Sequence, residues 1–174
     1  MDVPTLRDGD LVLRPMRPSD VDAVTAACQD PEIPRWTFVP SPYTRADAEG
    51  YLASSAAAAR AGQSLNLLAV DDHALLGSFG LMELDREPGF GEIGYWVAAE
   101  ARGRGIATRG VVLLADWARE ELGLTHIEVL PHKDNAASRR VAEKAGFADT
   151  GELVASPRAA VQEPIYAVYA WTAS

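Results

Sequence analysis

The stretch EIGYWVAAEARGRGIATRGVVLLADW, residues 92–117, passes from a strand pattern to a helix pattern. Residues 92–97 predict a strand, and from Ile106 apolar residues recur at helical spacing, which predicts a helix that ends at Gly123. Between them, Gly103 and Gly105 allow the backbone to curl so that successive N–H groups converge in front of the positive helix end. This turn is therefore predicted to bind a phosphate group.

Two other glycine patterns match known phosphate-binding motifs less well. GFGEIG, residues 89–94, satisfies G-x-G-x-x-G, but it leads into a strand and not into a helix, so we interpret it as a loop with a glycine in the following strand. A P-loop needs a lysine after its second glycine, whereas Gly110 is followed by Val111. The turn at residues 101–110 remains the phosphate candidate.

Hydrophobic patterns and turn residues predict the other elements. Strands are expected at residues 11–16, 64–70, 74–84, 126–130, 147–154 and 164–172. Helices are expected from a Ser19 or Asp20 cap to Cys28, from a Thr44 cap to Gly62, and over residues 135–145. Residues 30–43 hold four prolines and are expected to be a loop. The order predicts one α+β domain over residues 1–174, with a mixed sheet of about seven strands flanked by about four helices.

The chain is acidic but has one basic segment. Sixteen Lys and Arg against 25 Asp and Glu give a net charge of −9. Residues 102–144 carry eight basic and six acidic residues, about +2, which leaves about −11 for the rest. Such a basic segment suits a compact polyanion such as a coenzyme phosphate, and the acidic remainder of the surface would attract cationic substrates. The alternative is that surface charges are merely distributed unevenly along the chain. The net charge argues against a nucleic-acid partner.

The few cysteine and histidine residues argue against disulfide-bonded and metal-binding classes of protein. A single cysteine, Cys28, forms no internal disulfide, and three scattered histidines offer no metal-ligand spacing, so no metal is expected. No apolar stretch approaches the roughly 18 residues of a membrane span, and the first ten residues have acids where a signal peptide needs basic residues. We therefore expect a cytoplasmic protein with no membrane partner.

Residues 102–107, RGRGIA, fit the signature [QR]-x-x-G-x-[GA] of the GNAT superfamily of N-acetyltransferases, whose loop holds the pyrophosphate of acetyl-CoA. Residues 95–111, 135–147 and 11–20 together resemble the branch that includes the ribosomal-protein N-terminal acetyltransferases of the RimJ and RimL type. The resemblance covers nearly the whole chain. It implies a GNAT-like fold with a mostly antiparallel sheet, and acetyl transfer from acetyl-CoA to a primary amine by direct attack in a ternary complex.

The same resemblance implies where the coenzyme binds. The strand at residues 95–97 is expected to splay from residues 126–130, which frees Val97 N–H to stabilise the developing oxyanion. The implied coenzyme contacts are Trp96, Val97, Arg102, Gly103, Arg104, Gly105, Ile106, Ala107, Thr108, Asn135, Ser138 and Arg140. Arg139, Arg140 and Lys144 are either ligands of the adenosine 3′-phosphate or solvated surface charges.

The chemistry also needs a base and an acid. An amine with a pKa near 10 is about three units too basic at pH 7, so a base or desolvation must supply roughly 4 kcal/mol. Glu92 is the first candidate base, acting through water; the alternative is an exposed carboxylate at the start of a strand. Ser138, in the first helical turn after Asn135, is the candidate acid for the departing thiolate, unless Asn135 is only the N-cap and Ser138 a small residue of that turn. The alternative acids are Tyr95, Tyr166 and Tyr169, which would otherwise be core residues.

The acceptor stays open between a protein N-terminus and a small-molecule amine. Trp36, Phe38 and Tyr43, from the proline-rich segment, either pack on the core or wall the substrate pocket. An acyl-CoA-binding module without turnover is the alternative function, although the presence of Glu92, Asn135 and Ser138 favours an enzyme. A monomer and a homodimer both remain open.

Overall fold

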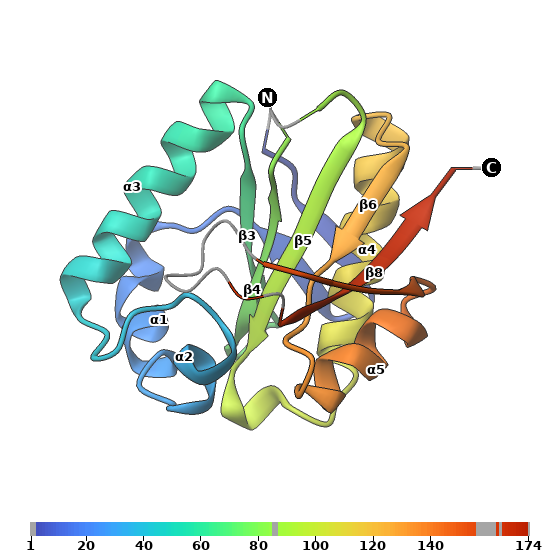
Figure 1. The fold of residues 1–174 in the computed structure, drawn as a ribbon. Coiled ribbons are helices and arrows are strands. Elements are labelled where there is room, and N and C mark those ends of the chain that lie inside the picture. The colour runs from blue at the N-terminus through green and yellow to red at the C-terminus, as the bar shows by residue number, and fades with distance from the viewer. Residues whose placement is uncertain (1–2, 85–86, 156–162, 164, 174) are drawn as a thin grey trace.

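The fold is built on one mixed sheet of eight strands in the order β1-β2-β3-β4-β5-β6-β8-β7 (Figure 1). The computed structural model describes residues 3–84, 87–155, 163 and 165–173. Neighbouring strands are antiparallel except β5 and β6, which are parallel. The strands are β1 (Leu6–Asp8), β2 (Leu11–Arg14), β3 (Leu65–Val70), β4 (Leu75–Met82), β5 (Phe90–Val97), β6 (His126–Val129), β7 (Ala148–Val154) and β8 (Tyr166–Thr172).

Helices cover both faces of this sheet (Figure 1). They are α1 (Val21–Ala27), α2 (Glu32–Trp36), α3 (Arg45–Ala61), α4 (Ile106–Glu121) and α5 (Ala136–Lys144), with short 3-10 helices η1 (Pro18–Asp20) and η2 (Ala99–Ala101). The predicted caps of α3 are confirmed: Thr44 Oγ1 accepts from Asp47 N–H at 3.3 Å, and Gly62 ends the helix with φ 75°. The mixed α+β architecture with a mostly antiparallel sheet is also confirmed.

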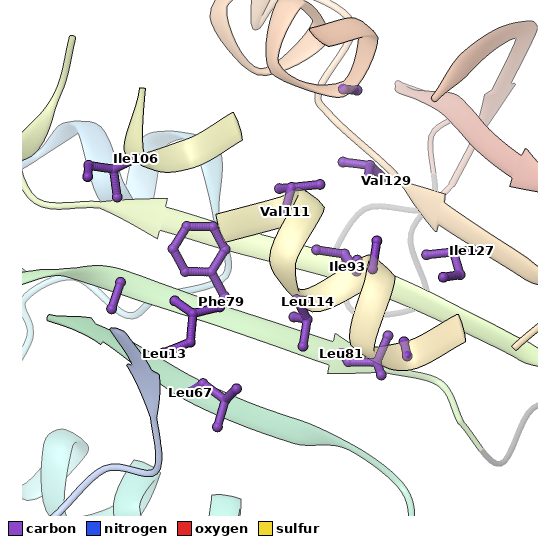
Figure 2. Packing of buried hydrophobic residues seen from close by; sticks show 14 of the residues in the cluster. Leu13, Leu67, Phe79, Leu81, Ile93, Ile106, Val111, Leu114, Ile127 and Val129 are labelled. Carbon is purple, nitrogen blue, oxygen red and sulfur yellow. The ribbon is translucent and has the colours of Figure 1, made fainter. Parts of the chain in front are cut away.

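The two faces of the sheet have separate cores, because successive side chains of a strand point to opposite sides. Leu67, Phe79 and Ile93 belong to the larger cluster, which packs on Val111 and Leu114 of α4 (Figure 2). Leu68 belongs to the second cluster, with side chains from α1 and α3. We call these two sides of the sheet the α4 face and the α3 face.

The structure corrects the prediction that residues 30–43 are a loop throughout, because α2 forms inside this segment. Its prolines are tolerated: Pro31 is the N-cap and Pro34 lies in the first turn, where a helix has no intrahelical use for the missing N–H. Asp30 Oδ1 accepts from Glu32 N–H at 3.0 Å and so caps this short helix.

Other expectations also change. Strand β1 was not predicted, because three residues of mixed polarity carry no alternating pattern, so the sheet has eight strands and not seven. Helix α1 starts after η1, and the Asp20 side chain is not its cap, because this carboxylate binds the Arg14 guanidinium at 2.7 and 2.8 Å. The last strand begins at Tyr166; its predicted start, Pro164, lies outside the described residues.

Candidate active site

A cavity of about 900 Å³ connects the two faces of the sheet at the end of β5. On the α3 face, its floor is formed by residues of the central strands that face the same side of the sheet: Asn66, Ser78, Gly80, Met82, Glu92, Gly94 and Trp96. On the other side, it is bordered by the turn before α4, by the segment after β6 and by α5. We call the part of the cavity over the α3 face the acceptor half and the rest the coenzyme half.

Two glycines make room for the acceptor half. Gly80 and Gly94 lie opposite each other on β4 and β5. A Cβ added to Gly80 would lie 2.7 Å from Asn66 Oδ1, and one added to Gly94 would lie 2.7 Å from the Met82 methyl carbon. A side chain at either position would therefore displace the end of the Asn66 or Met82 side chain and occupy part of the hollow above the strands.

The coenzyme half opens where β5 and β6 separate. Their pairing ends at Ile93 and Val129, four residues before β5 itself ends. Ala98 N–H donates to Leu76 O at 2.9 Å, and since N–H groups alternate along a strand, Val97 N–H points away from β4 into the opening. This arrangement agrees with the expected splay at residues 95–97.

The turn before α4 fits a phosphate group through its main chain. Gly103 and Gly105 have φ 74° and 75°, which L side chains rarely adopt, and Gly105 caps α4 without a side-chain hydrogen bond. The first N–H groups of a helix have no intrahelical partner, and here the first three come from Ile106, Ala107 and Thr108, which all border the cavity. The predicted phosphate turn therefore lies at the cavity.

The arginine side chains of this turn are paired with acids elsewhere. Arg102 Nη2 lies 2.6 Å from Asp30 Oδ2, and Arg102 Nε donates to Val97 O at 3.2 Å. Arg104 pairs with Asp71 at 3.3 Å. The Glu32 N–H and the Arg102 guanidinium hold the pKa of Asp30 below its usual value. These contacts brace the turn and leave its main-chain N–H groups for an anion.

The first turn of α5 places a hydroxyl pair beside the coenzyme half. Asn135 is the N-cap, as one interpretation of the sequence held, and its Oδ1 accepts from Ser138 N–H at 3.1 Å. Ser138 Oγ lies 2.8 Å from the Tyr95 hydroxyl, and both residues border the cavity. Burial raises the pKa of Tyr95 to about 12, so this phenol stays protonated at neutral pH.

The structure separates the three cations of α5. Arg140 and Lys144 border the cavity. Arg139 instead donates to the Tyr169 hydroxyl at 3.0 Å and pairs with Asp149 at 3.3 Å. Arg140 and Lys144 are therefore the cations of this helix that a coenzyme phosphate could reach.

Tyr169 is a core residue. It is fully buried, and its hydroxyl both accepts from Arg139 and donates to Glu143 at 3.2 Å. It does not border the cavity, whereas Tyr95 and Tyr166 do.

Glu92 is not an exposed carboxylate at the start of a strand, and that alternative is wrong. Strand β5 begins at Phe90, because Phe90 and Gly91 already pair with β6, so Glu92 is its third residue. The Glu92 residue is only 3% exposed. Its orientation places it on the floor of the acceptor half, on the opposite face from Tyr95. The structure thus brings Glu92 and Ser138 to one cavity from two sides of β5.

The aromatic residues of the proline-rich segment divide into two groups. Tyr43 is buried in the second core cluster and also borders the cavity, while Trp36 and Phe38 wall it. Their ring partners are His132 and Tyr166, at centroid distances of 5.6 and 6.1 Å. Sequence reasoning did not assign His132 to the site, because its contact with Trp36 joins segments about a hundred positions apart.

The described residues form neither a metal site nor a membrane-spanning helix. Within that part of the chain, no three His, Cys, Asp or Glu side chains come together as a metal site. None of the helices described is long and apolar enough to cross a membrane.

Comparison with known proteins places this site in a family. Residues 10–148 match the model of the acetyltransferase (GNAT) domain. YdaF of Bacillus subtilis, provisionally named a ribosomal N-acetyltransferase, is 38% identical over 81 residues, which are 47% of this chain and 44% of YdaF, less than half of that protein's length.

Solved structures show the same fold. RimJ of Mycobacterium smegmatis, in complex with CoA-disulfide, superposes with a TM-score of 0.84 at 24% identity over 98% of this chain and 87% of RimJ. RimL, a ribosomal L7/L12 alpha-N-protein acetyltransferase in complex with coenzyme A, superposes with a TM-score of 0.83 at 19% identity, covering 97% and 98% of the two chains. With the domain match spanning most of its length, the chain belongs to the GNAT acetyltransferase family.

Proposed function

We propose that this GNAT acetyltransferase moves an acetyl group from acetyl-CoA to a primary amine by direct attack in a ternary complex. One observation carries the proposal: a single cavity joins the main-chain anion site at Gly105 to the buried carboxylate of Glu92 through the opening beside Val97. Acetyl-CoA, when bound, supplies a thioester carbonyl that a neutral amine can attack.

The turn before α4 would hold the coenzyme. The N–H groups that follow Gly105 face the cavity with the positive end of a 16-residue helix behind them, which suits a pyrophosphate. Arg140 and Lys144 border the same half and supply positive charge for a further phosphate. The cavity is also large enough for a coenzyme arm, so the residues present fit this ligand.

Glu92 would accept the amine proton. Its carboxylate lies on the floor of the acceptor half, so an amine that enters from the α3 face meets it directly or through one water. Glu92 would first take one proton from the ammonium form, directly or through one water, so that the neutral amine can attack the carbonyl carbon. The second proton would leave the nitrogen to cavity water as the amide forms.

Val97 and Ser138 would complete the transfer. Val97 N–H, directed into the opening, donates to the carbonyl oxygen as negative charge develops on it. Ser138 Oγ would give a proton to the departing sulfur when the carbon–sulfur bond breaks. The Tyr95 hydroxyl, 2.8 Å away, would replace that proton and take one back from water in the open cavity, to which Glu92 releases the amine proton. Because the pKa of Tyr95 is raised to about 12, its proton is present throughout the neutral range.

The names of the relatives point to the N-terminal amine of a protein as one acceptor, and the acidic character of the chain suits a cationic amine generally. The single cysteine, Cys28, is buried, which fits the cytoplasm as the place of this reaction.

The test is thiol release from acetyl-CoA in the presence of a panel of amines, with each product identified by mass spectrometry. Thiol release that depends on an amine and yields an acetylated amine supports the enzyme. Tight coenzyme binding with no product from any amine would instead support a binding module without turnover.

A further inference from the structure

We propose that the acceptor half of the cavity takes a primary amine carried on an aromatic or other flat apolar group, with no carboxylate close to the amine. This inference deepens the acetyltransferase function proposed above and rests on it. It follows from the aromatic rings that line one wall of the cavity, from the charges around the acceptor half and from the polar residues of its floor.

Aromatic rings from two distant segments join in one wall of the cavity. Trp36 of α2 and Phe38 just after it contact His132 of the segment after β6 and Tyr166 of β8, so this wall runs from the acceptor half to the coenzyme half. The Trp36 and His132 centroids are 5.6 Å apart with the planes tilted by 58°, and those of Phe38 and Tyr166 are 6.1 Å apart with a tilt of 43°. These spacings are those of rings in direct contact, so the four side chains form one continuous wall against which a flat apolar group can pack.

The exposure of Phe38 indicates that this wall is open to a ligand. Its side chain is 45% exposed, which makes it one of the few large hydrophobic residues at the surface of the described chain. It borders the cavity, and a bound apolar group would cover it. Burying this area on both partners favours an apolar group over a polar one.

The charges of the acceptor half select against a carboxylate. None of the described cavity residues from α1, α2, α3, β3, β4 or β5 is Lys or Arg, whereas Glu32, Asp47 and Glu92 are acidic. The three basic residues at the cavity, Arg102, Arg140 and Lys144, come from the turn before α4 and from α5. A substrate carboxylate beside the amine would lose water without gaining a cationic partner.

The floor supplies polar partners for the amine end. The Tyr51 hydroxyl lies 2.9 Å from Ser78 Oγ, and Asn66 and Glu92 lie on the same face of the sheet. The hollow over Gly80 and Gly94 leaves space above these groups. An amine directed to this floor therefore places its apolar group toward the ring pairs at the wall.

The first experiment measures kcat/KM for four amines, each corrected to its concentration of neutral amine. We expect 2-phenylethylamine to exceed ethylamine by about tenfold or more, because the apolar ring adds buried area. We expect phenylalaninamide to exceed phenylalanine by about tenfold or more, because these two differ mainly in the charge beside the amine. Equal values within either pair would overturn the inference.

The second experiment assigns the preference to the rings. Trp36→Leu and Phe38→Leu keep an apolar side chain but remove the ring, and each is expected to raise KM for 2-phenylethylamine by about fivefold to tenfold, with the Kd of acetyl-CoA within about twofold. Leu153→Ala, on the exposed strand β7, is the control and should leave both constants unchanged. Unchanged KM in both ring variants would overturn the assignment to this wall.

Different results would rule out the acetyltransferase function and the aromatic acceptor. If no amine of any class releases thiol from acetyl-CoA, the acetyltransferase function fails. If ethylamine and phenylalanine are acetylated as fast as their partners, that function stands and only the aromatic, carboxylate-free acceptor is wrong. Far-ultraviolet circular dichroism and the Kd of acetyl-CoA show that each variant is folded.

Discussion

Glu92 and Tyr95 lie three positions apart on β5 and point to opposite faces of the sheet. Glu92 lies on the floor of the acceptor half, while Tyr95 stacks on Phe79 and reaches the Ser138 hydroxyl on the α4 face. Because β5 is no longer paired with β6 beyond Ile93, the cavity is continuous between the two faces of the sheet at this point. The proposed base and acid can therefore act on opposite sides of one thioester.

Gly105→Val tests the anion site in the main chain. A β-branched residue is strained at φ 75°, so the turn should open and calorimetric affinity for acetyl-CoA should fall by about a hundredfold. Gly123→Val is the matched control: it has φ 64° and open space around it, but it does not border the cavity. Both variants should lose about 1–2 kcal/mol of stability, and only the first should lose affinity.

Equal affinity in Gly105→Val and the wild type would remove the turn from the coenzyme site. Equal losses of affinity in both glycine variants would show that lower stability alone explains the effect.

Glu92→Gln tests the proposed base. The substitution keeps the shape and removes the proton acceptor, so kcat near neutral pH should fall about a hundredfold or more with acetyl-CoA affinity intact. The loss should shrink as the pH rises, because the amine is then already neutral. Glu128→Gln is the control, since Glu128 lies opposite Glu92 on β6 but does not border the cavity. Wild-type turnover by the Glu92 variant would return this carboxylate to a structural role.

Ser138→Ala tests the proposed acid. A thiolate is a tolerable leaving group without its proton, so turnover should fall by only about tenfold to a hundredfold, and the Kd of acetyl-CoA should stay within a few-fold. Tyr95→Phe should show a smaller loss of the same kind, because it removes only the group that replaces the serine proton. If Ser138→Ala has no effect and Tyr166→Phe lowers kcat, the acid lies on β8. If Ser138→Ala abolishes coenzyme binding, the hydroxyl is a ligand contact.

Asp30→Asn tests whether the turn before α4 also positions α2. The substitution keeps the oxygen that caps Glu32 but removes the charge that pairs with Arg102. We expect KM for the amine to rise by about threefold to tenfold, because Trp36 of α2 shifts, while acetyl-CoA affinity stays within a few-fold. Asp71→Asn removes the charge that pairs with Arg104, leaves the pair of Asp30 with Arg102 intact, and should leave the amine KM unchanged. An unchanged amine KM in Asp30→Asn would show that the ion pair of Asp30 and Arg102 stabilises the fold but does not position α2 for the amine.

The features that sequence predicted correctly have local causes. The turn at Gly103 and Gly105 follows from their backbone freedom, the Asn135 cap from its side chain, and the ends of α3 from Thr44 and Gly62. Each depends on a few consecutive residues, which is why pattern and composition were enough.

The features that sequence missed depend on contacts between distant segments. The burial of Glu92 comes from its place inside the sheet, and the pairing of Arg102 with Asp30 joins residues 72 positions apart. The wall formed by Trp36 and His132 also depends on a contact between distant segments of the chain. Helix α2 is a local feature that was missed because its prolines suggested a loop, although both occupy positions that a first turn accepts.

The most direct test of acetyl transfer in this cavity is the initial rate of thiol release from acetyl-CoA with 2-phenylethylamine, measured together with the mass of the amine product. With the wild type we expect rapid release and an amine heavier by one acetyl group. We expect Glu92→Gln to bind acetyl-CoA normally but to form product at least about a hundredfold more slowly. Equal rates of product formation by the two proteins would contradict the role of Glu92, and the absence of acetylated product from every amine tested would contradict the function itself.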